Sequence, residues 1–338
     1  IIEGGAGNDM LNGGDGDDII QDSFGDDNIK GGAGNDVINA GAGIDLIIAG
    51  DGNDFVFAGI DEKETFGGEG NDYIFAGNGS NTVFGDGGDD WIDGGEQADL
   101  LQGDNGDPFQ TSQIIGNDVV IGGGGNDDYD MEAGDDIAVT GAGVERYEGM
   151  LGFDWIIRQG DAETSAATEI DLAVTGLALP GTLEALRDRA DLVEAVSGWD
   201  FDDTLRGDNL TTVQLAANDP EAGQNNALNT VEQISLIDGL QGLLDGAFGA
   251  GQTSFSAGNI LLGGGGSDMI EGRGGNDLID GDKWLGVQLS YIDANNVEQI
   301  GRTHWPAKFL HHLIHAFKID TIFDQAVEAK EIGKENPI

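Results

Sequence analysis

Residues 4–12 read GGAGNDMLN, and residues 13–21 continue directly with GGDGDDIIQ. The same pattern returns at 31–39 as GGAGNDVIN, so the chain repeats itself with a period of nine residues. Eleven repeats follow one another without a slip from 4 to 102, and a stretched copy of ten residues plus five further copies extend the pattern to Ile157. A fixed short period of this kind is the signature of a solenoid, in which each repeat stacks on its neighbours.

Two positions of the repeat carry most of the information. The sixth is aspartate in thirteen of the seventeen repeats: Asp9, Asp18, Asp27, Asp36, Asp45, Asp54, Asp72, Asp90, Asp99, Asp118, Asp127, Asp136 and Asp154. The eighth is apolar in most repeats, as at Leu11, Ile20 and Ile29, with Thr65 as a polar exception. One apolar residue between two outward-facing neighbours predicts a three-residue strand whose middle side chain points inward. The glycines of positions one to five predict the turns, because only glycine adopts positive φ without steric strain.

These strands and turns predict an all-β parallel β-roll, a calcium-binding β-helix solenoid. Two repeats make one coil of a flattened spiral, so each loop stacks on the loop eighteen residues further on, about 4.8 Å away. Each gap between stacked loops then holds two carboxylates and several backbone carbonyls, which are all hard oxygen ligands. Ca²⁺ takes six to eight such ligands at roughly 2.3–2.6 Å, whereas Mg²⁺ keeps its water, so the gaps predict calcium sites.

On these residues the chain resembles the calcium-binding nonapeptide repeats of RTX (haemolysin-type) proteins. The resemblance implies that each ion takes the carbonyls of positions two and four and the aspartate of one loop. From the next loop it takes the carbonyls of positions one and three and the aspartate. For the first pair of loops on one edge these residues are Gly14, Gly16 and Asp18 with Gly31, Ala33 and Asp36. The same positions of the following loops are Gly32, Gly34, Ala49, Asp51, Asp54, Gly50, Gly52, Gly67, Glu69, Asp72, Gly68, Gly70, Gly85, Gly87 and Asp90.

Even-numbered and odd-numbered repeats form opposite edges of such a roll. The even edge has aspartate in five successive loops, from Asp18 to Asp90, and predicts four consecutive complete sites. Glu145 and the stretched repeat around Pro108 are expected to weaken the far end of this edge, where Asp127 also lies. The odd edge is expected to run through Asp9, Asp27, Asp45, Lys63, Asn81, Asp99, Asp118, Asp136 and Asp154. Its centre should therefore lack calcium.

Lys63 leaves two alternatives open, because it replaces the aspartate of position six. Its ammonium lies where an ion would otherwise sit, or it faces solvent in a degenerate loop. Solvent exposure is the more common behaviour of a lysine.

The pattern changes after the main roll, which we assign to residues 1–157. A linking region, 158–253, is expected to contain helices. After Pro180, the apolar residues Leu183, Leu186, Ala190 and Val193 have helical spacing, and a segment rich in Leu and Ile follows at 231–248.

The linking region also contains an isolated, disguised repeat at 198–206, with Asp203 and Leu205 in register. Clear repeats return over 254–289 with Asp268 and Asp277, which predicts a second short roll. Its metal sites are expected to be weak, because Asn259 and Gly286 replace the partner aspartates.

The last segment, 290–338, has a different character. From Gly301 it carries a broad apolar stripe that predicts an amphipathic helix, docked on the second roll. RTX proteins have an uncleaved C-terminal signal for export, and this helix occupies the corresponding place. His311 and His315 stand four residues apart and offer two metal ligands on one face, but the sequence shows no clear third ligand.

The composition excludes several classes of function. The chain has 338 residues, 60 of them glycine, and a net charge of −50. Such a charge repels nucleic acid and attracts cations. With no cysteine there are no disulfides, and no apolar run approaches the roughly 20 residues of a membrane span. Since the apolar content of each repeat is small and the carboxylates repel one another, we expect the roll to fold only when calcium binds.

A second resemblance concerns the residues around and after the end of the main roll. Residues 149–155, 186–194, 197–208 and 258–285 are similar to the C-terminal portion of large secreted bacterial haem peroxidases of the animal type. No peroxidase domain is present, and all four histidines lie in the last 35 residues, so we expect this chain to be non-catalytic. The expected context is extracellular, with type I secretion machinery and an upstream catalytic domain as partners. The alternatives are a structural segment of a surface adhesin or the tail of a secreted hydrolase.

Overall fold

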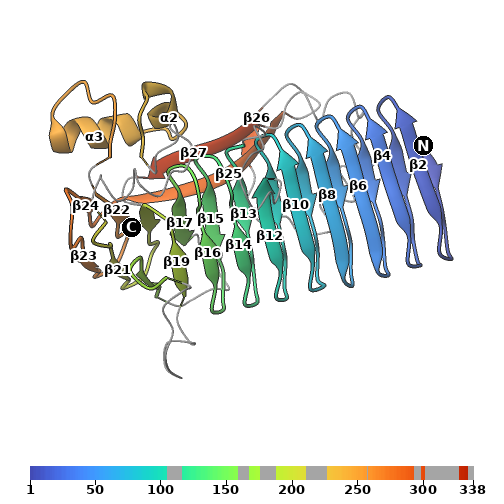
Figure 1. Ribbon diagram of the computed structural model, residues 1–338, viewed down its shortest axis with the longest axis horizontal. Helices are drawn as coiled ribbons and strands as arrows, with labels where there is room; N and C mark the ends of the chain where they lie inside the picture. Colours follow the sequence, from blue (N-terminus) through green and yellow to red (C-terminus); the bar gives the residue numbers. More distant parts are fainter. Residues whose placement is uncertain are drawn as a thin grey trace.

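The computed structural model describes residues 1–104, 116–158, 167–175, 188–210, 227–256, 258–292, 298–300 and 327–333. It is a parallel β-solenoid in which the chain alternates between two long sheets, so the predicted fold class is confirmed (Figure 1). The twelve-stranded sheet contains β1 (Ile2–Glu3), β3 (Ile19–Gln21), β5 (Val37–Asn39), β7 (Phe55–Phe57), β9 (Tyr73–Phe75), β11 (Trp91–Asp93), β13 (Val119–Ile121), β15 (Ile137–Thr140), β17 (Trp155–Arg158), β20 (Ala195–Ser197), β22 (Ile260–Leu262) and β24 (Leu278–Asp280). The nine-stranded sheet contains β2 (Met10–Asp15), β4 (Asn28–Ala33), β6 (Asp45–Asp51), β8 (Lys63–Glu69), β10 (Thr82–Gly87), β12 (Leu100–Asp104), β14 (Asp128–Asp130), β16 (Arg146–Glu148) and β19 (Arg189–Asp191).

The register of the strands confirms that two repeats make one coil. Ile20 of β3 pairs with Ile38 of β5, and Ile29 of β4 pairs with Ile47 of β6, both in parallel and both eighteen residues apart. The residue at position eight points between the two sheets in every coil, and Ile20, Ile29 and Ile38 have no exposed surface. The core is therefore a narrow row of position-eight side chains, with small position-one residues such as Ala40 and Ala49 beside them.

The stretched repeat around Pro108 corrects one expectation. β11 pairs with β13, and β12 pairs with β14, so the spacing between partners rises from 18 to 28 residues at this point. Because these strands pair directly, the ten extra residues between the partners add no strand to either of the two sheets. Counting them as a repeat therefore exchanged the two edges for all later residues. Asp118, Asp136 and Asp154 continue the even edge, whereas Asp127 and Glu145 continue the odd edge.

The prediction of a helix after Pro180 is wrong for the residues that the structure describes. Ala190 lies in the middle of strand β19, which pairs with β16, and Val193 precedes β20. Both side chains are buried because they belong to the repeat pattern and not to a helix face. Asp188 with Ala190, and Glu194 with Val196, reproduce the acidic sixth and apolar eighth positions of the repeat. The earlier part of the expected helix, 176–187, lies outside the described residues.

Two helices occur in the segment rich in Leu and Ile, α2 (Val231–Ser235) and α3 (Leu240–Phe248). α2 begins with a capping box, in which Thr230 and Gln233 exchange hydrogen bonds. Ile234 and Leu244 pack in one cluster with Trp91, Val119 and Trp155 of the twelve-stranded sheet. The helices thus cover apolar side chains on the outer face of this sheet, which explains why those strands are apolar on both faces.

The division of the chain at 157 and 254 has no counterpart in the sheets. β17 pairs with β20, β20 with β22, and β22 with β24, so one twelve-stranded sheet runs through both boundaries. The disguised repeat supplies β21 (Thr204–Arg206). It forms a third sheet with β18 (Glu169–Asp171) and β23 (Met269–Glu271). The repeats of 254–289 therefore extend the main stack.

After these repeats the chain forms an antiparallel sheet of β25 (Trp284–Ile292), β26 (Glu298–Ile300) and β27 (Val327–Gly333). This sheet runs roughly along the long axis of the stack (Figure 1). The apolar stripe predicted as a helix, including His311 and His315, lies outside the described residues up to 326, and the residues that follow it form β27. No helix among the described residues is long and apolar enough to cross a membrane.

Candidate calcium sites between stacked loops

The aspartates of position six are tied to the stack by one of their two oxygens. On the even edge, Oδ1 of each aspartate accepts a hydrogen bond from the backbone N–H of the aspartate one coil earlier. The distances are 2.8 Å for Asp36, 2.7 Å for Asp54 and 2.7 Å for Asp72. The odd edge has the same ladder, since Oδ1 of Asp27 accepts from the N–H of Asp9 at 2.7 Å. Each side chain is thereby turned into the gap between loops.

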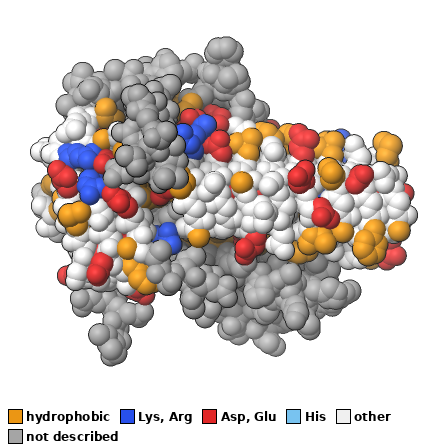
Figure 2. Space-filling view, turned by 90° about the horizontal axis from the view of Figure 1, so that it is seen from below, with side chains coloured by type: hydrophobic (Ala, Val, Ile, Leu, Met, Phe, Trp, Pro, Cys, Tyr) orange, Lys and Arg blue, Asp and Glu red, His pale blue; other side chains and the backbone are white. Residues whose placement is uncertain are grey.

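The second oxygen of these carboxylates is buried without a hydrogen-bond partner. This holds for Oδ2 of Asp9, Asp27, Asp36, Asp54, Asp72, Asp90, Asp99, Asp127 and Asp154. A buried carboxylate oxygen that lacks a donor is unfavourable unless a cation neutralises it. On the face of the stack seen in Figure 2, red carboxylates are scattered and do not form a continuous acidic patch, although the chain has 64 acidic residues.

Backbone carbonyls complete each gap from both sides. A methyl group added to Gly32 would come closer than 3.0 Å to the carbonyl group of Gly14, and one added to Gly34 would come equally close to that of Gly16. The carbonyl groups of positions two and four therefore point forward, to the next loop. A methyl group added to Gly31 would meet both the carbonyl oxygen of Ala49 and Oδ2 of Asp36. The position-one carbonyl therefore points backward, to the spot where the free carboxylate oxygen lies.

The carbonyl of position three points backward as well, since the carbonyl of Ala33 accepts a hydrogen bond from the N–H of Gly16 in the previous loop at 2.6 Å. The same bond joins Asp51 to Gly34, Glu69 to Gly52 and Gly87 to Gly70. The structure thus brings together the carbonyls and aspartates that the RTX resemblance assigns to one ion. Forward carbonyls, backward carbonyls and an unpartnered carboxylate oxygen form a set of hard oxygens that fits Ca²⁺.

The charges in the gaps make the metal-free stack unfavourable. The pKa of Asp36 is raised to about 6, that of Asp54 to about 7 and that of Asp72 to about 9, mainly by burial and in smaller part by repulsion from neighbouring carboxylates. Burial and the nearby Asp118 and Asp72 carboxylates also raise the pKa of Asp90 well above its ordinary value. Near neutral pH these groups need either a proton or a metal ion.

The even edge continues beyond the stretched repeat. The N–H of Asp90 donates to Oδ1 of Asp118 at 2.8 Å, and the ladder proceeds through Asp136 and Asp154 to Glu194. On the odd edge, the N–H of Asp99 donates to Asp127 at 3.0 Å, and the ladder proceeds through Glu145 to Asp188. Neither Asp188 nor Glu194 was expected from the sequence, although each precedes an apolar residue by two positions.

The first gap of the odd edge has a third carboxylate that the sequence analysis missed. Carboxylate oxygens of Asp9, Asp22 and Asp27 all lie within 4.8 Å of one another. Asp22 occupies position one, is 5% exposed, and has no hydrogen-bond partner for Oδ2. A methyl group added to Gly4 would meet this oxygen, at the place where other gaps present a backbone carbonyl. An acidic residue at a position that is usually Gly or Ala was the available signal.

The last repeats form two further pairs of loops. The replacement of the later partner by Gly286 stays a prediction, and on the other side of this loop the N–H of Asp203 donates to Oδ1 of Asp268 at 2.9 Å. Asp203 and Asp268 lie 65 residues apart in the chain, so a search for partners eighteen residues apart does not find this pair. Asp277 accepts from the N–H of Asn259 at 3.0 Å, as expected for that pair.

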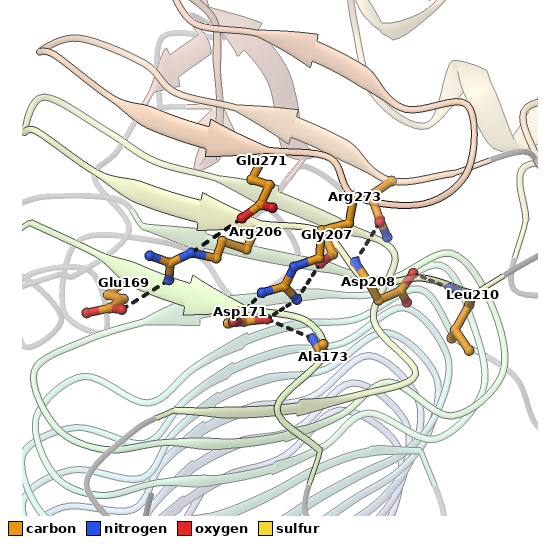
Figure 3. A network of polar contacts seen from close by, with 10 residues as sticks. Glu169, Asp171, Ala173, Arg206, Gly207, Asp208, Leu210, Glu271 and Arg273 are labelled. Atoms are coloured by element: carbon orange, nitrogen blue, oxygen red, sulfur yellow. Dashed lines mark hydrogen bonds and ion pairs between the residues drawn. The ribbon is translucent and has the colours of Figure 1, made fainter. Parts of the chain in front are cut away.

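Two arginines join the strands of the neighbouring three-stranded sheet through hydrogen bonds and ion pairs (Figure 3). Arg273 donates to both carboxylate oxygens of Asp171, at 2.5 and 2.7 Å, and to the Gly207 carbonyl at 2.9 Å. Arg206 of the central strand β21 forms ion pairs with Glu169 of β18 and with Glu271 of β23. These contacts link β18, β21 and β23.

The geometry defines a class: a parallel roll of nonapeptide repeats whose loops present oxygen ligands to divalent cations. The sequence pattern of the RTX calcium-binding nonapeptide repeat matches residues 1–21, 12–47, 31–61, 66–101, 115–138 and 254–283. These segments are therefore RTX repeats, which bind calcium and are typical of secreted bacterial proteins. Neither a curated protein nor a solved structure matches the chain.

Proposed function

We propose that this chain is a calcium-dependent folding module of a secreted bacterial protein. The observation that supports it is the row of buried, unpartnered carboxylate oxygens beside carbonyls from two successive loops. Calcium supplies the cohesion that the narrow core does not, so metal binding and folding form one event. Extracellular modules bind calcium at roughly 10⁻⁴–10⁻³ M, so the chain stays unfolded in the cytosol and folds after export.

Circular dichroism of the full chain during a calcium titration tests this proposal. We expect the β-sheet signal and a cooperative thermal transition to appear with Ca²⁺ and to be absent in EDTA or with Mg²⁺ alone. A β-sheet signal and melting temperature that are the same in EDTA and in calcium would contradict it.

A matched pair of variants separates metal binding from simple loss of charge. Asp54→Asn and Asp17→Asn each remove one negative charge. Asp17 accepts a hydrogen bond from the N–H of Asn35, and asparagine fills the equivalent role at Asn35 and Asn53, so Asp17→Asn should keep the wild-type calcium midpoint. Asp54→Asn replaces a free oxygen in the gap by an NH₂ group. We expect it to need about ten times more calcium to fold, since one charge-assisted contact contributes roughly 1.5–3 kcal/mol.

We further propose that the chain is non-catalytic and supports type I export of an upstream catalytic domain. The resemblance of 149–155, 186–194, 197–208 and 258–285 to the tails of haem peroxidases supports a peroxidase in that place. Haem staining and intact mass of the native secreted polypeptide would test this context. An adhesin would instead show tandem modules upstream, and a hydrolase would show turnover by this chain alone.

A further inference from the structure

One gap of the odd edge contains a side-chain cation. Position six of the loop 58–63 is Lys63, which has no exposed side-chain surface. The equivalent gaps of the stack contain aspartates, so this lysine lies buried among groups that elsewhere face a divalent ion. A buried ammonium is unfavourable unless oxygens surround it.

The oxygens around Lys63 come from the positions that the resemblance assigns to calcium. Nζ donates to the carbonyl of Gly43 at 2.5 Å and to the carbonyl of Ile60, and it lies 3.3 Å from Oδ2 of Asp45. Gly43 is position four and Asp45 position six of one loop, and Ile60 is position three of the next. The carbonyl of Asp61 lies at 3.5 Å, and the three protons of the ammonium match the three nearer oxygens.

We propose that the Lys63 ammonium fills a cation site of the calcium type, as a substitute for the metal that is covalently part of the chain. This inference rests on the proposed function, because it assumes that calcium fills the equivalent gaps. The solvent-facing alternative for Lys63 is wrong, since the residue is 3% exposed. One side-chain charge neutralises Asp45, so the gap between the loops 40–45 and 58–63 closes without an ion.

Asn81, in the next loop of the same edge, makes a related substitution. Its Nδ2 group donates to the carbonyl of Gly79 at 2.9 Å and to the carbonyl of Gly94 at 3.3 Å. Gly79 is position four of its loop and Gly94 is position one of the following loop, again positions assigned to calcium. Its Oδ1 keeps the ladder intact by accepting from the N–H of Lys63 at 3.1 Å. Side-chain nitrogen donors thus replace metal in two gaps at the centre of the odd edge.

The main test converts the lysine into the residue that position six usually has. Lys63→Asp in the full chain is expected to bind at least one more Ca²⁺ per chain than wild type in equilibrium dialysis. Lys30→Asp is the matched control, because Lys30 is exposed and the charge change is the same. It should bind the wild-type number of ions. A folded Lys63→Asp protein with the wild-type number of ions would overturn the proposal.

A second variant covers the case in which Lys63→Asp does not fold. Lys63→Met keeps the long unbranched side chain and removes only the ammonium. We expect its melting temperature in saturating calcium to fall below that of wild type, whereas Lys30→Met melts like wild type. Equal melting temperatures for Lys63→Met and wild type would overturn the inference. If wild type binds no calcium at all, the proposed function fails instead, and the dialysis of wild type distinguishes the two failures.

Discussion

At the scale of single residues, Thr65 places a hydroxyl group in the row of apolar position-eight side chains that forms the core. It lies in register between Ile47 and Val83, is fully buried, and its Oγ1 has no hydrogen-bond partner. A buried hydroxyl without a partner costs about 1–3 kcal/mol, and valine has nearly the same shape. We expect Thr65→Val to raise the melting temperature in saturating calcium, measured by calorimetry. Val83→Thr is the reciprocal control and should lower it, and a Thr65→Val protein that melts at or below wild type would refute this reasoning.

The residue at position six decides what fills each gap. Aspartate presents one oxygen to the ladder and leaves the other for a cation, as at Asp36 and Asp54. Lysine supplies the cation itself, and the amide of Asn81 supplies a neutral donor. One position therefore tunes how many ions the stack needs without changing the backbone around it.

At the scale of the loops, close stacking leaves no room for a side chain at Gly32, which occupies position two of its loop. Gly14 and Gly32 both have positive φ, of 104° and 128°, so alanine is strained at either position. A methyl group on Gly32 would also collide with the carbonyl of Gly14, whereas a methyl group on Gly14 meets nothing within 4 Å. We expect Gly32→Ala to lower the melting temperature in calcium clearly more than Gly14→Ala. Equal effects of the two variants would show that backbone strain alone, and not the collision with the next loop, lowers the melting temperature.

The elements that the sequence predicted are those set by local periodicity. The inward position eight and the aspartate of position six fixed the strands, the coil and the even-edge gaps up to Asp90, because each depends only on residues eighteen apart. The stretched repeat before Asp118 was misread because hydrogen-bond pairing, and not residue count, decides which edge a loop joins. Ala190 and Val193 have a spacing that fits a helix and a short repeat equally well. The sequence left two alternatives open for Lys63, because the oxygens that bury it come from two loops brought together only by the fold.

At the scale of the whole molecule, the high negative charge and the small hydrophobic core both act against folding. The chain has a net charge of −50, and its core is one side chain deep. Both features favour an expanded chain unless cations enter the stack. The Lys63 and Asn81 gaps need no ion and lie between calcium-type gaps of the same edge. On withdrawal of calcium, the centre of the odd edge is therefore the part that loses its cohesion last.

The raised pKa values predict opposite pH responses with and without calcium. The pKa of Asp54 is about 7 and that of Asp72 about 9 in the folded chain, both raised mainly by burial, against about 3.9 when unfolded. Between these limits the folded state holds more protons than the unfolded state, so the stability of the metal-free stack falls as pH rises. In EDTA we therefore expect β-structure to increase from about pH 8 to about pH 5.

Calcium binds the deprotonated carboxylates, so the calcium midpoint should move to higher concentration over the same acidification, with protons released on binding at the acidic pH values where the metal-free stack is folded and protonated. General relief of charge repulsion also favours the acidified chain, and a pair of double variants separates the two causes. Asp54→Asn with Asp72→Asn makes the gap groups permanently neutral and should flatten the pH response in EDTA. Asp17→Asn with Asp89→Asn, which removes the same charge outside the gaps, should flatten the response much less, because Asp17 acts on Asp36 and Asp54 only as a minor source of repulsion. A metal-free protein that loses β-structure on acidification, or equal flattening by both pairs, would show that the buried carboxylates do not control folding.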